Sequence, residues 1–349
     1  MTSDSSVTAV TRSFEDRLKR WVTECLQNME VIEEFQWLPL TGDAGFRFYF
    51  RISLPNTSLI AVYSPPETEN NQAFCDIDRF FFQQGIHVPK ILAYLEAEGF
   101  FLLEDLGEKM YLDHLSDETA SSLYGEAFFA LLRIQQCPLD ESILPRYDRD
   151  FLLSEMQLFC QWFVAELLGY DINDEEQQLI ERTFCVILDS ALEQPQVVVH
   201  RDYHSRNIVY GVAGSPGIID FQGALIGPLT YDVVSLLRDC YIEWPDQQVR
   251  SWALAYASLS VDAGIMESVS EERYLRWFDL MGLQRHIKVL GIFARLSIRD
   301  DKQAYLKDLP LVIAYVRRIA RLYSETSPFA DWFDAVLLPC IHSQPWMHN

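Results

Sequence analysis

The first hundred residues alternate between one helical stretch and several strands. Apolar residues at positions 18, 21, 22, 25 and 26 follow helical spacing, which predicts a short N-terminal helix. Aromatic and β-branched runs predict four strands, at 46–52, 58–63, 88–95 and 99–106. Between them, residues 70–83 place four apolar side chains on one face and predict a helix that ends at Gly85.

After residue 108 the apolar positions recur mostly at helical spacing. Ser116 or Asp117 is the expected cap of the first of these helices. Further helices are predicted at 150–168, 173–192, 231–241, 246–258, 271–299 and 310–324. Short strands interrupt this pattern only at 197–199, 208–210 and 217–220. We therefore expect an α+β protein with a strand-rich N-terminal lobe (1–104) and a mainly helical C-terminal lobe (105–349).

The composition is that of a globular, acidic protein. The 349 residues are 49% hydrophobic and carry a net charge of −23. This charge argues against non-specific binding to nucleic acid or anionic membranes. No apolar run is long enough to span a membrane, and the seven scattered cysteines fit a reducing compartment, so we expect a cytoplasmic protein. Residues 273–321, with 11 Lys and Arg against 4 Asp and Glu, are locally basic and could attract an anionic substrate.

A polar cluster follows the apolar strand VVV at 197–199. The sequence HRDYHSRN places Asp202 and Asn207 five residues apart on one predicted loop, and Asp220 ends the next short hairpin. We expect the hairpin to return Asp220 to this loop. One carboxylate can then face a substrate, while the Asn–Asp pair supplies the hard oxygen ligands that Mg²⁺ prefers. Each residue alone has an ordinary structural explanation; their spacing favours a metal–nucleotide site.

This spacing resembles the H-R-D-x-x-x-x-N pattern of kinases, a standard phosphoryl-transfer template. The segment after Asp220 lacks a protein-kinase activation segment, and it is similar to that of aminoglycoside-phosphotransferase-like small-molecule kinases. Six blocks more narrowly resemble bacterial anomeric N-acetylmuramate/N-acetylglucosamine kinases: TGDAGFRFYFRI, LLEDLG, HRDYHSRN, IDFQ, GPLTYDVVSLLRDCYIEW and RHIKVLGIFARL. The resemblance implies a bilobal, protein-kinase-like fold. It also implies ATP-dependent phosphorylation of the C1 hydroxyl of these amino sugars in cell-wall recycling.

The resemblance further implies roles for individual residues. Asp202 is the expected catalytic base, and Asn207 and Asp220 the expected Mg²⁺ ligands. ATP would contact Gly42, Asp43, Ala44, Gly45, Arg47, Leu103, Glu104 and Leu106. Asp232 and His200 are expected to be structural residues. Asp232 would accept hydrogen bonds from the loop backbone or from His200.

One kinase feature is missing from the sequence. Kinases usually place a lysine on the third strand and a glutamate on the next helix, but no Lys or Arg occurs between Arg51 and Arg79. Either Arg47 or Arg51 substitutes for the lysine, or the protein is a nucleotide-binding pseudokinase. Rival substrates within the class are choline, homoserine and aminoglycosides, and the basic segment 273–321 argues mildly against a polycationic aminoglycoside.

The residues that would bind the sugar are less clearly marked. Arg285, Lys288 and Arg295 share one face of a predicted helix and could bind the lactyl carboxylate of N-acetylmuramate, or could pair with acids such as Asp300 or Asp301. Other candidates lie near the catalytic motif: His204, Arg206, Gln222, Tyr231, Arg238 and Asp239. Arg238 and Asp239 could equally form an internal salt bridge.

Overall fold

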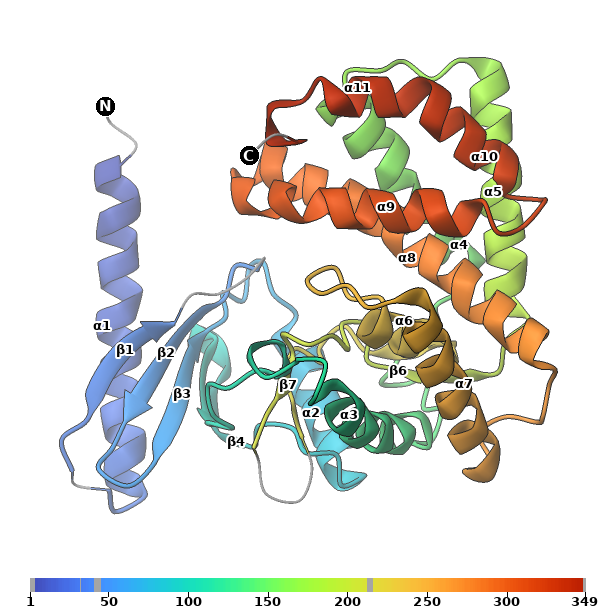
Figure 1. Cartoon of the computed structure of the whole chain (residues 1–349). Coiled ribbons are helices and arrows are strands. Elements are labelled where there is room, and N and C mark those ends of the chain that lie inside the picture. The colour runs from blue at the N-terminus through green and yellow to red at the C-terminus, as the bar shows by residue number, and fades with distance from the viewer. Residues whose placement is uncertain (1–3, 32, 41–44, 212–215, 348–349) are drawn as a thin grey trace. The chain divides into compact units, whose positions relative to one another are not determined.

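The computed structural model describes residues 4–31, 33–40, 45–211 and 216–347, with side chains from Phe14 onward (Figure 1). The chain divides into two compact units. The first contains Met1–Lys109 and Val209–Gln222, and the second contains Met110–Ile208 and Gly223–Asn349. The proposed metal ligand Asp220 therefore belongs to the first unit, whereas Asp202 and Asn207 belong to the second.

The first unit is built on one antiparallel sheet of five strands in the order β1-β2-β3-β5-β4. Its strands are β1 (Gln36–Leu40), β2 (Phe48–Ser53), β3 (Ser58–Tyr63), β4 (Ile91–Leu95) and β5 (Phe100–Glu104). Its helices are α1 (Asp4–Asn28) and α2 (Asn71–Gln83). A separate two-stranded ladder joins β7 (Ile208–Val209) to β8 (Gly217–Ile218).

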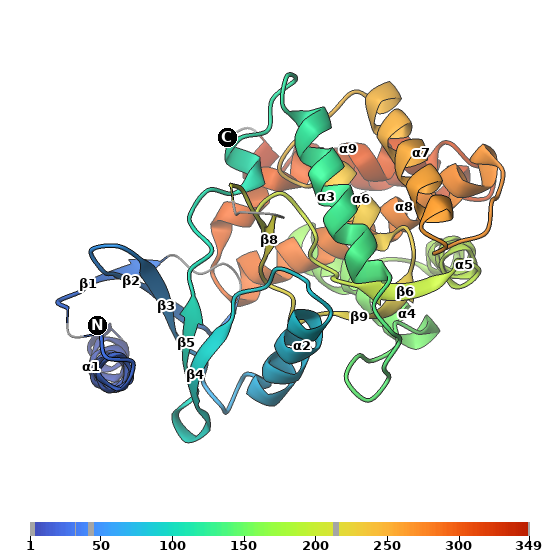
Figure 2. The same ribbon diagram turned by 90° about the horizontal axis from the view of Figure 1, so that it is seen from below.

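The two helices cover opposite faces of this sheet, as Figure 2 shows. Successive strand side chains point to opposite faces. Phe100 and Leu102 of β5 accordingly pack in a core with α1, whereas Phe101 and Leu103 pack in a second core with Cys75 of α2. The same alternation places the odd-numbered residues of β2 on the α2 side of the sheet.

The second unit is mainly helical. Its helices are α3 (Ala120–Gln135), α4 (Arg149–Leu158), α5 (Asp174–Leu192), α6 (Tyr231–Leu237), α7 (Asp246–Asp262), α8 (Glu271–Arg299), α9 (Leu309–Ala320), α10 (Ser327–Trp332) and α11 (Leu338–His342). A π-helical segment, Phe159–Leu167, continues α4. The antiparallel pair β6 (Gln196–Val199) and β9 (Leu225–Pro228) is the small sheet of this unit.

Helix α8 is the central element of the second unit. It contacts α4, α5, α6, α7 and α9, so neighbours surround it on several sides. Most of its residues between Tyr274 and Ser297 are consequently buried, including the charged Arg285 and Lys288. Buried charges need partners, because an unpaired charge in the interior is costly. These two residues therefore identify α8 as an element with more than a packing role.

The structure confirms the predicted α+β class, with strands concentrated in the first unit and helices in the second. The predicted cap of the first C-terminal helix is wrong: α3 begins after Thr119, and Ser116 and Asp117 lie in the preceding turn. The helix predicted at 231–241 ends earlier, at Leu237. Strands β1 and β9 were not predicted.

Within the part of the chain that the structure describes, no helix combines the length and apolar character that crossing a membrane requires.

Candidate active site

The backbone of the loop after β6 donates hydrogen bonds to Asp232, in the first turn of α6. The Asp232 carboxylate accepts hydrogen bonds from the backbone N–H groups of His200, at 2.7 Å, and Arg201, at 2.9 Å. Burial raises the pKa of Asp232 to about 7, while these two hydrogen bonds act in the opposite direction. Asp232 thus fixes the backbone immediately before Asp202.

Asp220 and the neighbour of Asp202 have left-handed backbone conformations. Arg201, next to Asp202, has φ of 80°, and Asp220 has φ of 64°. Non-glycine residues rarely adopt positive φ, and such strain is concentrated at functional sites. In this chain one such residue precedes the expected base and another is an expected metal ligand, while Glu30 and Asp301 also have positive φ.

The far end of the loop is held by a second buried acid. Asp239 accepts hydrogen bonds from the backbone N–H and hydroxyl of Ser205, at 2.9 and 2.5 Å, and from the backbone N–H of Tyr241. Within the loop, the Asn207 side-chain amide donates to the Asp202 carbonyl at 3.0 Å. Two carboxylates, Asp232 in the first turn of α6 and Asp239 just after this helix, therefore fix the loop that carries the predicted base.

The Asp202 carboxylate is partly exposed and surrounded by cations. Removal from bulk water raises the pKa of Asp202, but Lys288 and other nearby cationic groups outweigh this effect, and the net pKa is lowered. The carboxylate is therefore ionised at neutral pH. An ionised, partly exposed carboxylate on a rigid loop can accept a proton from a bound hydroxyl group.

A buried glutamate that the sequence reading missed organises these cations. Glu155 of α4 forms ion pairs with Lys288, at 3.0 Å, and with Arg201, and it accepts a hydrogen bond from Tyr147. Burial raises the pKa of Glu155, but Lys288 and Arg201 outweigh it and hold the pKa below its ordinary value. A signal was present in the sequence, because Glu155 interrupts an apolar helical stripe.

Tyr231 connects the two cations of α8. Its hydroxyl accepts a hydrogen bond from Lys288 at 2.9 Å, and the Arg285 guanidinium lies 5.1 Å from its ring centre. Nε and Nη1 of Arg285 are buried and have no hydrogen-bond partner among the described residues. Lys288 thus binds both Tyr231 and Glu155, whereas Arg285 retains two nitrogens without a hydrogen-bond partner among the described residues.

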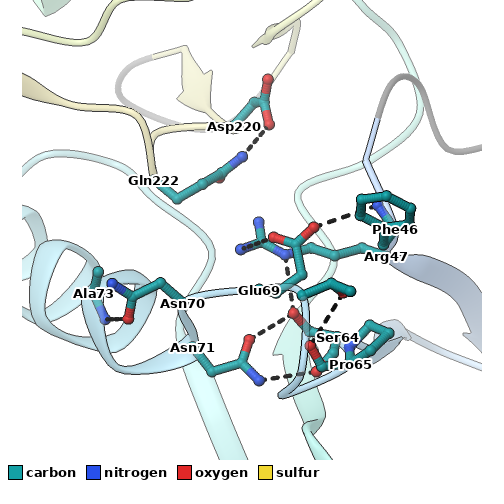
Figure 3. A network of polar contacts seen from close by, with 11 residues as sticks. Phe46, Arg47, Ser64, Pro65, Glu69, Asn70, Asn71, Ala73, Asp220 and Gln222 are labelled. Atoms are coloured by element: carbon teal, nitrogen blue, oxygen red, sulfur yellow. Dashed lines mark hydrogen bonds and ion pairs between the residues drawn. The ribbon is translucent and has the colours of Figure 1, made fainter. Parts of the chain in front are cut away.

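In the first unit, Asp220 lies next to Gln222 (Figure 3). Its Oδ1 accepts a hydrogen bond from Gln222 at 2.6 Å. Burial raises the pKa of Tyr49, nearby Arg47 opposes this shift, and Asp220 adds to it, so both charged groups act on Tyr49. Tyr49 and Arg47 are odd-numbered positions on or next to β2, on the α2 side of the sheet.

Arg47 and Arg51, the two candidates for the missing lysine, have different surroundings. Arg47 forms an ion pair with Glu69 at 3.2 Å and donates to the Ser64 hydroxyl at 3.1 Å. All three guanidinium nitrogens of Arg51 are occupied, by Asp105, Glu108 and the carbonyl of Gly107.

The other residues predicted to contact ATP also lie in the first unit. Leu103 is buried on β5, Leu106 is partly buried, and Glu104 is exposed at the end of the strand. A β-carbon built on Gly45 would lie 3.6 Å from Oε1 of Glu69. Gly42, Asp43 and Ala44 lie outside the described residues.

Several predicted sugar-binding residues make contacts within the second unit. Arg238 forms a buried ion pair with Asp279 at 2.5 Å, so its pairing with the neighbouring Asp239 is not observed. Arg206 lies over the ring of Tyr241, 3.5 Å from its centre, and the His204 ring packs edge-on against the same tyrosine. Lys288 pairs with Glu155 rather than with Asp300 or Asp301.

The chemistry of Asn207 and Asp220 suits Mg²⁺. The side-chain nitrogen of Asn207 is engaged by the Asp202 carbonyl, which directs the amide oxygen to the opposite side of the group. Asp220 contributes a carboxylate. Amide and carboxylate oxygens are hard donors of the kind that Mg²⁺ binds together with phosphate oxygens.

Comparison with known proteins identifies relatives along most of the chain. Residues 36–267 match the model of the family described as Phosphotransferase enzyme family. A protein of Pseudomonas aeruginosa, named N-acetylmuramate/N-acetylglucosamine kinase, is 40% identical over 306 residues, which cover 86% of this chain and 90% of the relative. A protein of the same name from Neisseria meningitidis is 36% identical over 317 residues, covering 89% and 92%.

Solved structures show that the fold is protein-kinase-like, as predicted. An ethanolamine kinase of Plasmodium vivax has a TM-score of 0.61 at 13% identity and covers 81% of this chain and 82% of its own. The ADP-bound aminoglycoside phosphotransferase APH(2'')-Ib has a TM-score of 0.56 at 16% identity, covering 85% and 98%. At these identities the likeness concerns the fold alone.

Proposed function

The chain belongs to the phosphotransferase enzyme family, and from this premise we propose that it phosphorylates the C1 hydroxyl of N-acetylmuramate and N-acetylglucosamine, with ATP as phosphoryl donor. The observation that carries the proposal is the 36–40% identity, over most of the chain, to proteins named N-acetylmuramate/N-acetylglucosamine kinase. The product would be the sugar 1-phosphate, a compound suited to the recycling of cell-wall sugars in the cytoplasm.

Asp202 is the proposed general base. Its carboxylate, held ionised by the cations around it, would accept the proton of the C1 hydroxyl as the sugar oxygen attacks the γ-phosphorus. The bond between the γ-phosphorus and the bridging oxygen breaks, and ADP leaves. Asp232 and Asp239, which bind the loop backbone, would keep the base in position during this transfer.

Asn207 and Asp220 are the proposed Mg²⁺ ligands. The ion, when bound, neutralises charge on the phosphate oxygens. Both residues supply oxygen donors of the kind that Mg²⁺ binds together with phosphate oxygens.

Arg285 and Lys288 of α8 are the proposed receptor for the lactyl carboxylate of N-acetylmuramate. Both residues act electrostatically on Asp202. Arg285 is the primary candidate, because two of its nitrogens have no hydrogen-bond partner among the described residues. Lys288, bound by Glu155 and Tyr231, would contribute charge rather than a direct contact.

A coupled ADP-release assay with Mg²⁺ and each amino sugar tests the proposal, and NMR of the product identifies the phosphorylated position. Asp202→Asn is expected to lower kcat by about 10²–10⁴, the usual contribution of base catalysis, while ATP binding persists. Near-normal turnover in this variant would remove the base assignment. Tight ATP binding without turnover of either sugar by the unaltered protein would instead indicate a pseudokinase.

Arg285→Gln tests the carboxylate receptor. We expect kcat/KM for N-acetylmuramate to fall at least about tenfold more than kcat/KM for N-acetylglucosamine, because only the first sugar carries a carboxylate and a lost charged hydrogen bond costs about 1.5–3 kcal/mol. The second sugar is therefore the internal control. An equal loss for both sugars would assign Arg285 to the fold or to the shared reaction.

A further inference from the structure

We infer that Glu69 is a positioning residue that holds Arg47 as the phosphate-binding cation of this chain, in place of the lysine missing from β3. The inference rests on the proposed ATP-dependent function and adds a residue that the sequence did not indicate. It depends on contacts within the first unit, which Figure 3 shows from close by.

Strand register brings Arg47 next to the vacant lysine position. The antiparallel pairing of β2 and β3 sets Tyr49 opposite Val62 and Phe48 opposite Tyr63. Continued by one residue, the register sets Arg47 opposite Ser64, and the hydrogen bond between these two side chains agrees with it. Arg47 thus places a cation beside Ser64, the residue that follows β3.

Glu69 fixes the orientation of this cation. One carboxylate oxygen pairs with Arg47 Nη2 at 3.2 Å, and the other accepts the backbone N–H of Phe46 at 3.3 Å. Glu69 therefore holds both the guanidinium and the backbone that precedes it. Glu69 lies two residues before α2, so the acid that pairs with this cation precedes the helix instead of lying on it.

An aromatic stack ties Arg47 to the proposed metal ligand. The guanidinium lies 5.2 Å from the ring centre of Phe74, and Phe74 stacks on Phe221 at 5.3 Å. Phe221 is the residue next to Asp220. A triphosphate bound through Asp220 would therefore lie within reach of Arg47.

Arg47 retains donors for such a ligand. A guanidinium carries five N–H groups; the contacts with Glu69 and Ser64 use two and a hydrogen bond with Tyr49 uses a third, so two remain. Arg51 has less capacity, because four of its five N–H groups are already bound by acids or a carbonyl group. The structure thus separates two residues that the sequence leaves equivalent.

The experiment is a double-mutant cycle read by equilibrium binding of a non-hydrolysable ATP analogue, and separately by kcat. Arg47→Met is expected to weaken analogue binding and lower kcat by about 10²-fold, the effect of losing one charged transition-state donor. Glu69→Gln alone should weaken analogue binding about tenfold and lower kcat about tenfold. In the Arg47→Met background, Glu69→Gln should add less than about twofold, because its effect passes through the arginine.

Two controls keep the result interpretable. AMP binding should change little in either variant, since Arg47 is assigned to the terminal phosphates. Asp76→Asn removes a different arginine–carboxylate pair of the same unit, with Arg79, and should leave analogue binding unchanged. Thermal unfolding of each variant establishes that it is folded.

The outcomes are distinct for the two proposals. Independent, multiplicative losses in the cycle, or unchanged analogue binding in Glu69→Gln, would overturn the positioning role. Failure of the unaltered protein to bind the analogue would instead overturn the proposed ATP-dependent function itself.

Discussion

The two units hold their functional cations in different ways. In the second unit, Arg201 and Lys288 share one carboxylate, Glu155, and the Lys288 and Glu155 side chains are each only 7% exposed. In the first unit, Arg47 pairs with Glu69, whereas Arg51 pairs with Asp105 and Glu108, so the two arginines have separate acids. Removal of the shared buried carboxylate leaves two charges unpaired, whereas removal of one acid of the first unit leaves at most one.

The difference fits the tasks that we propose. The second unit carries the loop of the proposed base, whose backbone would have to be rigid for base catalysis, and buried acids hold it at several points. The first unit presents arginines along one face of a sheet. Arg47 can be engaged by its partner or by a ligand without collapse of the core, because hydrophobic residues on both faces of the sheet form that core.

Glu155→Gln should have the largest effect on stability. Breaking a buried ion pair by removing one partner typically costs about 3–5 kcal/mol, because the remaining charge is left buried. We expect a loss of this size in the free energy of unfolding, measured by urea denaturation and circular dichroism. Asp189→Asn is the matched control, since it removes a solvent-exposed pair with Arg149. Equal losses for both variants would refute the contrast between buried and exposed pairs.

His286 should make the stability of the second unit sensitive to mild acid. Burial lowers the pKa of His286 to about 3, and its ring stacks on Tyr315. Because the folded pKa lies below the unfolded value of about 6.5, the stabilisation that the neutral His286 contributes is complete above pH 6.5. It is lost at up to about 1.4 kcal/mol per pH unit as the pH falls from 6.5 toward 3. His286→Gln should flatten this slope in unfolding measurements between pH 7 and 5, and an unchanged slope would contradict the assignment.

Arg51→Met should have the smallest of these effects, in the first unit. Burial raises the pKa of Asp105, but hydrogen bonds from Arg51 and other donors outweigh it, so the pKa is lowered. The stabilisation is therefore present above the unfolded pKa of about 4 and is lost as the pH falls through the folded value. We expect the free energy of unfolding of Arg51→Met to be lower by about 1–2 kcal/mol at pH 7, and this difference to shrink below pH 4.

The exposed pair of Arg17 with Glu98 is the control for this experiment. Glu98→Gln should change the unfolding free energy by less than about 1 kcal/mol at any pH, as expected for a surface pair. An Arg51→Met deficit that is independent of pH would assign the effect to lost packing of the arginine side chain rather than to its charge.

Elements with strong local patterns were predictable from the sequence. The helix predicted at 271–299 coincides with α8, and that at 70–83 matches α2 within one residue. Strand β9 was missed because its sequence, LIGP, contains glycine and proline, which disfavour strands, yet pairing with β6 holds it in place. The cap of α3 was misplaced because several capping residues precede it and local propensity does not choose among them.

For the site, the sequence alone determined the residue types and their spacing in the loop from His200 to Asn207, because a motif within one loop is a local property of the chain. Which acid pairs with which cation was decided only by the tertiary structure. Glu155 and Arg201 are 46 residues apart, and Arg47 and Glu69 lie on separate elements. Such pairs depend on which helix and strand faces pack together, and residue spacing along one chain carries no record of that packing.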